Sequence, residues 1–335
     1  MTKLTLFTNI ISIHQLPVAK LLTEQLNGEF SMVCWEPPSA ERTKLGWDKA
    51  AEVKWLVQAW ASESEKHKAM ALLHSSETVI WGYAPLAEIN RRVEAGKLTF
   101  CYNERPLKRG RWRLISPRVL KWLYDTYHLS NSAAYHTLAV GPHCASDYKL
   151  MGMFRNKMWR WGYFPQVFEF PTPKPANEIP TVLWVGRMLD WKRVDLLLKA
   201  AAWARKYGNV PFRVRIIGYG PEEAALRWLA EKLHLSDICS FEGPMGPQEI
   251  AKAMFEADIY FFPSSSYEGW GAVVNEAMSQ GCCVIGSSAT GSAPWLIQHG
   301  VNGFLFSGGS PAESGKILLA CLENPQRTHA IGLAA

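Results

Sequence analysis

The chain has 335 residues, of which 48% are hydrophobic and 20% are charged, and its formal net charge is +6. These values are typical of a globular protein and exclude a disordered or collagen-like chain, while the length favours two domains. Seven scattered cysteines lack metal-ligand spacing, and no apolar run approaches the ~18 residues of a membrane-spanning helix. We therefore expect a cytoplasmic protein with reduced thiols.

The positive charge belongs to the first half of the chain. Residues 1–168 hold 22 Lys and Arg against 14 Asp and Glu, whereas residues 169–335 hold 14 against 16. The basic residues gather at positions 105–121 and 155–160, with aromatic residues among them. This pattern is compatible with a solvated charged face, or with peripheral contact to an anionic membrane, where Trp sits at the headgroup level. No nucleic-acid-binding motif accompanies it, so we expect no nucleic-acid partner.

Strands and helices are predicted to alternate along the first half. The apolar segments at residues 4–7, 78–81, 98–102 and 136–140 are predicted strands, and residues 16–26, 48–61 and 117–127 are predicted helices. This alternation predicts a Rossmann-like parallel-sheet domain over residues 1–168. Five prolines, at positions 165, 171, 173, 175 and 180, then exclude regular structure. Residues 169–180 are therefore the predicted linker.

The second half carries the clearer alternation. Strands are predicted at residues 181–185, 213–217, 258–262 and 282–286, and helices at 194–207, from 222, at 247–257 and at 272–280. The pattern predicts right-handed βαβ units and a second Rossmann-like domain over residues 181–335. Such sheets bind ligands at the carboxyl ends of their strands.

A Ser- and Gly-rich loop between a predicted strand and helix carries the strongest chemical signal. Gly269 and Gly271 leave room for a phosphate near the helix start, with Trp270 between them. Glu268 precedes the helix and Glu276 lies inside it, an offset of roughly 7–8 Å along the helix axis. The two carboxylates are thus spaced to accept hydrogen bonds from a sugar and from a ribose on either side of a diphosphate.

Two cations follow the first strand of the second domain. Arg187 and Lys192 lie in the loop after residues 181–185, at the same predicted edge of the sheet. Cations at this position stabilise the negative charge that develops on a departing nucleoside diphosphate.

Taken together, these segments resemble retaining glycosyltransferases of family 4, the group 1 enzymes with the GT-B fold. Glu268 and Glu276 match the family's Glu-x7-Glu pattern, and Arg187 with Lys192 resembles its diphosphate-binding pair. Gly218 and Gly243 stand in segments that resemble the next two strand ends, the second near the nucleobase. The resemblance covers residues 180–330 and includes a turn at 300–303.

The resemblance implies transfer of a sugar from a nucleoside-diphosphate sugar to a glycan or lipid-linked acceptor, with retained anomeric configuration. It implies a GT-B fold of two Rossmann-like domains facing a deep cleft, with the acceptor at residues 1–168 and the donor at residues 181–335. Arg187, Lys192 and Glu268 are then the expected catalytic residues. The expected substrate-binding residues are Glu276, Gly269, Trp270, Gly271, Gly218 and Gly243. No metal and no separate cofactor are expected, and the setting would be polysaccharide or cell-envelope synthesis at the inner face of the membrane.

The first domain offers weaker candidates for substrate binding. His14 follows the first predicted strand and Glu104 follows the strand at residues 98–102, but each is also compatible with a structural role. Members of the family usually finish with a helix that crosses back to the first domain, and we expect this chain to end before it. Two alternative functions remain open: an inactive nucleotide-sugar-binding scaffold, and a nucleotide-sugar epimerase of the same fold.

Overall fold

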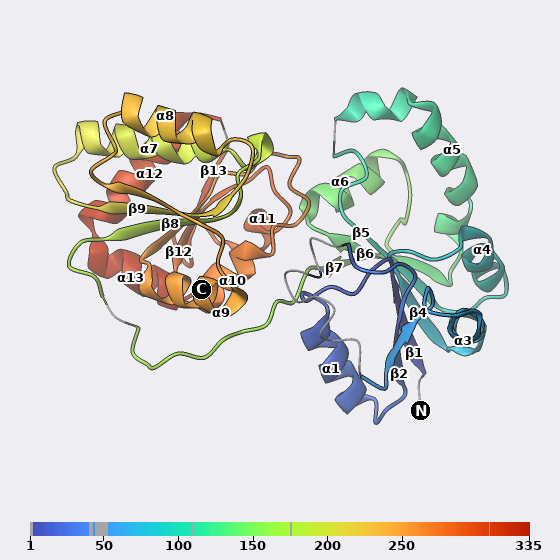
Figure 1. The fold of residues 1–335 in the computed structure, drawn as a ribbon. Helices are drawn as coiled ribbons and strands as arrows, with labels where there is room; N and C mark the ends of the chain where they lie inside the picture. Colours follow the sequence, from blue (N-terminus) through green and yellow to red (C-terminus); the bar gives the residue numbers. More distant parts are fainter. Residues whose placement is uncertain (1–2, 40–42, 44–52, 109, 175, 308) are drawn as a thin grey trace. The chain divides into compact units, whose positions relative to one another are not determined.

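The chain folds into two compact units, each built around its own parallel sheet (Figure 1). The computed structural model describes residues 3–39, 43, 53–108, 110–174, 176–307 and 309–335. Unit 1 comprises residues 1–166 and unit 2 comprises residues 167–335. In the described part of both units, helices lie between most successive strands, as the alternating sequence pattern predicts.

Unit 1 contains a seven-stranded sheet in the order β3-β2-β1-β4-β5-β6-β7, with all neighbours parallel. Helix α1 lies on one face of this sheet, and α3 and α4 lie on the other (Figure 1). The strands are β1 (Leu4–Thr8), β2 (Phe30–Cys34), β3 (Leu56–Gln58), β4 (Thr78–Trp81), β5 (Thr99–Asn103), β6 (Tyr135–Val140) and β7 (Met158–Trp161). The helices are α1 (Leu16–Gln25), α3 (Glu63–Ser75), α4 (Leu86–Glu94), α5 (Pro117–Thr126) and α6 (Pro142–Leu150), with short 3₁₀ turns η2 (Arg111–Ile115) and η3 (Leu129–Asn131).

The four strands predicted in unit 1 are present, and so are the helices predicted at residues 16–26 and 117–127. The helix predicted over residues 48–61 is wrong where the chain is described, because residues 56–58 form strand β3 and pair with β2. Leu56 and Val57 are buried there, and sheet pairing outweighs the local helical spacing. Residues 48–52 of that prediction lie outside the described part of the chain.

A buried arginine fixes helix α4 to the sheet of unit 1. The Arg92 guanidinium is 2% exposed and donates hydrogen bonds to the carbonyls of Leu73, Glu77 and Leu98 and to the Thr99 hydroxyl. Burial lowers the pKa of Arg92 to about 10. Four hydrogen-bond acceptors compensate for removing this cation from water, and these bonds hold α4 in place beside the sheet.

Unit 2 contains a six-stranded parallel sheet in the order β10-β9-β8-β11-β12-β13. The strands are β8 (Thr181–Arg187), β9 (Arg213–Tyr219), β10 (Cys239–Glu242), β11 (Ile259–Phe262), β12 (Cys283–Ser287) and β13 (Phe304–Phe306). The helices are α7 (Val194–Tyr207), α8 (Glu223–Lys232), α9 (Pro247–Glu256), α10 (Val273–Ser279), α11 (Ala293–Leu296), α12 (Pro311–Glu323) and α13 (Pro325–Leu333), with the 3₁₀ turn η4 (Asp190–Lys192). Every element predicted in this half is present.

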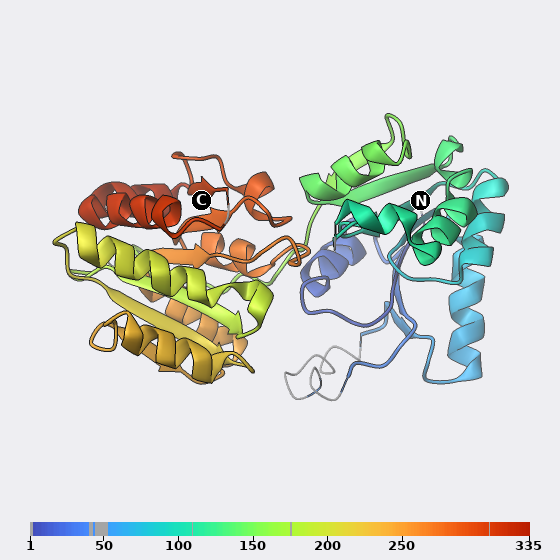
Figure 2. The ribbon, with the colours of Figure 1, turned by 90° about the horizontal axis from the view of Figure 1, so that it is seen from above.

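Both faces of the unit 2 sheet are buried. In β8, Val182 and Trp184 face the core beneath α7, α8 and α12, whereas Leu183 and Val185 face the core beneath α9 and α10. Helix α7 lies between α8 and α12 on the first of these faces (Figure 2). Because successive side chains point to opposite faces, a strand with apolar residues at every position is the sequence signature of a sheet covered on both sides.

The Pro-rich segment follows the surface of unit 2 without regular structure in its described residues. Its contacts are specific: Phe170 stacks on Phe255, and the Lys174 ammonium donates to the carbonyls of Met254 (3.1 Å) and Gln280 (2.8 Å). Lys174 is only 6% exposed, and burial lowers its pKa. We call residues 168–180 the strap, because Phe170 and Lys174 fix its described part to the rest of unit 2.

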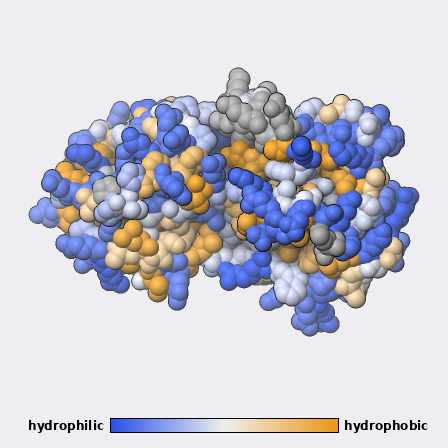
Figure 3. All heavy atoms as spheres, turned by 90° about the horizontal axis from the view of Figure 1, so that it is seen from below, coloured by the Kyte–Doolittle hydropathy of each residue, from blue (hydrophilic) through white to orange (hydrophobic). Residues whose placement is uncertain are grey.

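Charged and apolar side chains are mixed on the face of the molecule that Figure 3 shows, with hydrophilic groups predominating. Scattered exposed apolar residues are normal on protein surfaces. Among the described residues, every helix is too short or too polar to span a membrane.

Candidate functional site

The candidate site of unit 2 lies where the strand order reverses. From β8 the chain proceeds to β9 on one side of the sheet, and later returns to β11 on the other side of β8. Ligands of open parallel sheets bind at such a switch point, beyond the carboxyl ends of the strands. Arg187 is the last residue of β8 and is exposed, while the Ser- and Gly-rich loop follows β11.

Two predicted catalytic residues from separate loops form an ion pair at this switch point. Lys192, in η4, donates from its ammonium to Oε2 of Glu268, and the two side chains are 21% and 14% exposed. The two loops are also joined through their backbones, since the Ser265 amide donates to the Trp191 carbonyl at 2.8 Å. The fold therefore brings Lys192 and Glu268 together across 76 residues of sequence.

Glu276 lies within α10, and burial raises its pKa from the ordinary 4.5 to about 7. The phenol of Tyr260, on β11, lies in the core beneath α10, the helix that carries Glu276. Burial raises the pKa of Tyr260 well above its ordinary value, and the negative charges of Glu276 and Glu268 raise it further. The Tyr260 hydroxyl donates to the carbonyl of Val185 at 3.1 Å. Both carboxylates of the Glu-x7-Glu pair thus lie near one buried hydroxyl.

The glycines and tryptophan of the loop have defined roles in its backbone. Gly271 has φ of +85°, and a Cβ atom there would collide with the ring of Phe262. Gly269 is buried against Gly291, with no space for a Cβ atom on Gly291. Trp270 is 3% exposed, donates from its indole to Asn275 at 2.8 Å, and packs edge-on against Trp295. The side chain of Trp270 therefore braces the loop from inside unit 2.

Gly218 and Gly243 lie at neighbouring strand ends and differ in their surroundings. Gly218 is paired with Gly186 across β9 and β8, and with φ of +132° it has no room for a Cβ atom beside the Gly186 carbonyl. Close approach of two strand ends therefore explains this glycine. Gly243 follows β10, is exposed, and has open space where a Cβ atom would lie.

In unit 1, a tyrosine brings the two weaker candidates together. The ring of Tyr163 stacks parallel to His14 with 6.2 Å between centroids, and its hydroxyl donates to Oε1 of Glu104 at 2.8 Å. The second oxygen of Glu104 accepts a hydrogen bond from Lys108 at 3.0 Å. His14 and Glu104 therefore share Tyr163 as a neighbour at the carboxyl end of β5. No local sequence motif predicts this arrangement, because the three residues are far apart in the sequence.

Sequence reasoning did not single out Tyr260 or Tyr163. Tyr260 is the one polar side chain of β11, whose other residues are Ile259, Phe261 and Phe262, and a lone hydroxyl in a fully buried strand was a usable signal. Tyr163 gave no such signal, because it stands in an irregular segment next to prolines. Among the described residues, no cluster of three His, Cys, Asp or Glu side chains is arranged to hold a metal ion.

The fold and the switch-point site define an α/β protein of two Rossmann-like units, the GT-B architecture. Residues 168–335 match the family model described as glycosyl transferases group 1, half of the chain, and the chain belongs to that family.

Among curated relatives, the chain is 29% identical over 181 residues to the amylovoran biosynthesis glycosyltransferase AmsK of Erwinia amylovora, covering 52% of this chain and 44% of AmsK. The chain spans less than half of the length of the curated relatives it matches. Among solved structures, Anabaena Alr3699/HepE in complex with UDP and glucose is similar with a TM-score of 0.68 at 17% identity, over 100% of this chain and 93% of that one. The lipopolysaccharide outer core galactosyltransferase WaaB, in its apo form, gives a TM-score of 0.70 at 16% identity, over 99% and 94%.

Proposed function

We propose that this protein is a retaining glycosyltransferase of family 4 that transfers a sugar from a nucleoside-diphosphate sugar to a glycan or lipid-linked acceptor. The observation that carries the proposal is the switch point of unit 2, where Lys192 is paired with Glu268 and Glu276 lies near the same buried phenol. A cation and two carboxylates at the carboxyl ends of β8 and β11 suit a ligand with a central diphosphate and hydroxyl-bearing groups on both sides.

In the proposed reaction, the bond from the anomeric carbon to the diphosphate oxygen breaks while the acceptor oxygen bonds to that carbon on the same face. The acceptor's hydroxyl proton passes to the departing phosphate, so no enzyme nucleophile is needed. Arg187 and Lys192 would stabilise the charge that accumulates on the leaving diphosphate, in place of a metal ion. Glu268 would hold hydroxyls of the transferred sugar, and Glu276 those of the ribose.

The donor is tested first by binding. The full chain is titrated calorimetrically with UDP and with a panel of UDP-, GDP- and ADP-sugars, and we expect at least one to bind. Glu276→Gln should weaken that binding by about tenfold or more, since hydrogen bonds to a charged group contribute about 1.5–3 kcal/mol. Glu231→Gln, an exposed glutamate at the end of α8, is the matched control and should bind like the unmodified protein.

Product analysis then separates transfer from the other activities of such a site. Slow hydrolysis of the donor with retained configuration, or transfer to an added glycan, supports the proposal. Conversion of the donor to its epimer without acceptor would indicate an epimerase instead. Binding without turnover in the presence of acceptor would indicate a scaffold, and binding of no nucleotide-sugar in the panel would refute the donor site itself.

We propose a role in polysaccharide or cell-envelope glycan synthesis, in the cytoplasm at the inner face of the membrane. The names of the similar proteins support this setting: AmsK is an amylovoran biosynthesis glycosyltransferase, and WaaB is a lipopolysaccharide outer core galactosyltransferase. HepE was solved with UDP and glucose, which supports a UDP-sugar as the first donor to test.

The segment formed by η2 and α5 is the proposed membrane contact. Three apolar side chains here are unusually exposed: Trp112 at 65%, Ile115 at 79% and Leu120 at 51%. The same segment carries the basic residues Arg111, Arg113, Arg118 and Lys121. An apolar side chain at the interface with basic neighbours suits an anionic lipid surface, to which each Lys or Arg adds about 1 kcal/mol.

Vesicle sedimentation tests this contact. We expect the chain to bind vesicles of phosphatidylcholine containing phosphatidylglycerol, and to bind less at high salt. Trp112→Ser combined with Ile115→Ser should abolish most of the binding. The matched control, Trp228→Ser with Val301→Ser, removes two exposed apolar residues of unit 2 and should change little. Equal sedimentation of both double variants would contradict the assignment.

A further inference from the structure

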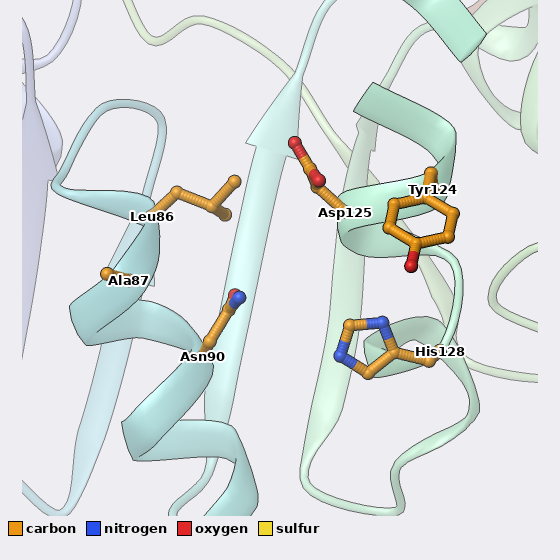
Figure 4. A pocket seen from close by; sticks show the side chains of 6 residues that line it. All are labelled: Leu86, Ala87, Asn90, Tyr124, Asp125 and His128. Atoms are coloured by element: carbon orange, nitrogen blue, oxygen red, sulfur yellow. The ribbon is translucent and has the colours of Figure 1, made fainter. Parts of the chain in front are cut away.

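Unit 1 has a pocket between α4 and the end of α5 that the proposed donor site does not use (Figure 4). Its volume is about 540 Å³, and its lining comprises Leu86, Ala87, Asn90, Tyr124, Asp125 and His128. That volume lies within the range of small-molecule sites, roughly 300–1,000 Å³. Asn90 reaches into the pocket from α4, opposite Tyr124 and His128 on the other wall (Figure 4).

Apart from Asp125, the polar side chains of this pocket lack hydrogen-bond partners in the described part of the chain. Oδ1 of Asn90 is buried, and the described residues offer it no hydrogen-bond partner. The side chains of Tyr124 and His128 likewise make no hydrogen bond within the described chain, and Tyr124 is 85% exposed. Buried polar atoms in folded proteins are nearly always paired, so the Asn90 carboxamide requires an explanation. A bound ligand that donates a hydrogen bond to it supplies one.

The charges of the lining narrow the class of ligand. An anionic ligand would meet the Asp125 carboxylate at close range. A cationic ligand would compete with Lys121, whose ammonium already donates to Oδ2 of Asp125 at 2.8 Å. A neutral ligand rich in hydroxyls fits both facts, because each hydroxyl donates to Asp125 or to the Asn90 oxygen and accepts from the Asn90 amide.

The apolar part of the lining suits the carbon face of a sugar ring. A pyranose ring has an apolar C–H face and an equatorial rim of hydroxyls. The exposed ring of Tyr124 would cover that face, while Leu86 and Ala87 would contact the carbon edge and the polar groups would take the rim. Arg92, two residues after Asn90 on α4, attaches this helix to the carbonyls of Leu73, Glu77 and Leu98 and so fixes one wall of the pocket.

We propose that the pocket between α4 and α5 binds a neutral sugar residue. Its assignment to the acceptor glycan, at a unit other than the one that receives the transferred sugar, rests on the proposed function. Asn90 and Tyr124 are the residues that recognise this sugar. A second binding site of this kind would let the protein select an extended glycan over a single sugar.

Saturation-transfer NMR tests the pocket directly. The probes are the methyl glycosides of glucose, galactose, mannose and N-acetylglucosamine at millimolar concentration, with the full chain. We expect at least one to receive saturation from the protein, and Tyr124→Ala to weaken its binding by about tenfold or more. Tyr207→Ala, which removes an exposed tyrosine of unit 2, is the control. The Trp112→Ser, Ile115→Ser variant should keep sugar binding.

Asn90→Leu gives a second, independent readout. Removing a side chain whose buried oxygen has no partner is neutral or stabilising, so this variant should melt at the same temperature or higher while losing the glycoside. A purely structural Asn90 would leave glycoside binding intact. If no glycoside binds while UDP does, the inference fails and the proposed function stands. If a glycoside binds and both variants retain it, the sugar lies elsewhere and the inference fails too. If a glycoside binds in the pocket while no nucleotide-sugar binds, the sugar site stands and the proposed function fails.

Discussion

At the scale of single residues, Glu276 links function to stability. Its pKa is raised to about 7 because burial disfavours the charged carboxylate. Below pH ~4 the carboxyl is protonated in both the folded and unfolded chain. As pH rises from about 4.5 to about 7, the unfolded chain releases this proton first, so the free energy of unfolding falls by up to about 3 kcal/mol. Above pH ~7 the free energy of unfolding stays lower by this full amount.

Glu276→Gln should therefore stabilise the protein above pH ~7 by up to about 3 kcal/mol and leave it nearly unchanged below pH ~4. Urea unfolding at a series of pH values measures this difference. Glu231→Gln should show no such pH dependence. A constant difference between the Glu276 variant and the unmodified protein at all pH values would mean that the carboxyl is not perturbed. Gain of stability with loss of nucleotide binding is typical of a binding residue.

Lys192 offers a sharper test of where the diphosphate lies. Its ammonium is paired with Glu268. Methionine at this position has a side chain of similar length but no charge. Lys192→Met should weaken UDP binding by about tenfold to a hundredfold, because it removes a hydrogen bond between charged groups. Uridine lacks the phosphates, so its binding should be unchanged. Calorimetric titrations with the two ligands measure this.

The matched control is Lys199→Met, one turn into α7, where the ammonium is paired with Asp195 instead. Loss of uridine and UDP affinity in equal measure would place Lys192 away from the phosphates.

The local sequence identified these residues because each follows a recognisable strand. The local sequence did not contain their pairing, since Lys192 and Glu268 are 76 positions apart and are brought together by sheet topology alone. The same applies to His14 and Glu104, which meet only through Tyr163. The importance of the buried Tyr260 hydroxyl depends on which groups surround it. Those groups come from distant parts of the sequence, so only the fold identifies them.

At the scale of elements, the strap shows how composition predicts conformation without predicting packing. Its prolines correctly exclude helix and strand, and the sequence suggested a linker over residues 169–180. What composition did not predict is the contact made by Lys174, whose four-carbon stem reaches two buried backbone carbonyls of unit 2. Lysine is rarely this buried, so no sequence rule indicates such a contact.

Lys174→Met keeps the apolar stem but leaves the carbonyls of Met254 and Gln280 without their donor. We expect a loss of about 1–3 kcal/mol in the free energy of unfolding, the cost of unsatisfied buried polar groups. Urea unfolding of the full chain measures it. Lys252→Met, in which the ammonium removed is solvent-exposed, should change the stability by less than about 0.5 kcal/mol. Equal stability of the two variants would show that the hydrogen bonds of the Lys174 ammonium contribute nothing to the stability of unit 2.

At the scale of the whole molecule, the two units differ in how well their sequences specify them. In unit 2, strands β8, β9, β11 and β12 have apolar cores and alternate with helices, so the sequence predicted them, whereas β10 and β13 at the two edges of the sheet were not predicted. Unit 1 includes β3, of three residues, and β7, whose Met158 to Trp161 are all at least partly exposed. Edge strands this short take their structure from the strand beside them, which a window of sequence does not contain.

The strap leaves very little chain to connect the two units. The Phe164 amide donates to the His14 carbonyl within unit 1, and the Phe168 carbonyl accepts from Gln280 within unit 2. Only Pro165, Gln166 and Val167 separate these two anchors. Because proline fixes its own φ, about five free backbone torsions lie in this segment, which joins unit 1 to unit 2 along the chain. A further proline at position 166 would fix one more φ and restrict the residue before it, leaving about four torsions between the two anchors.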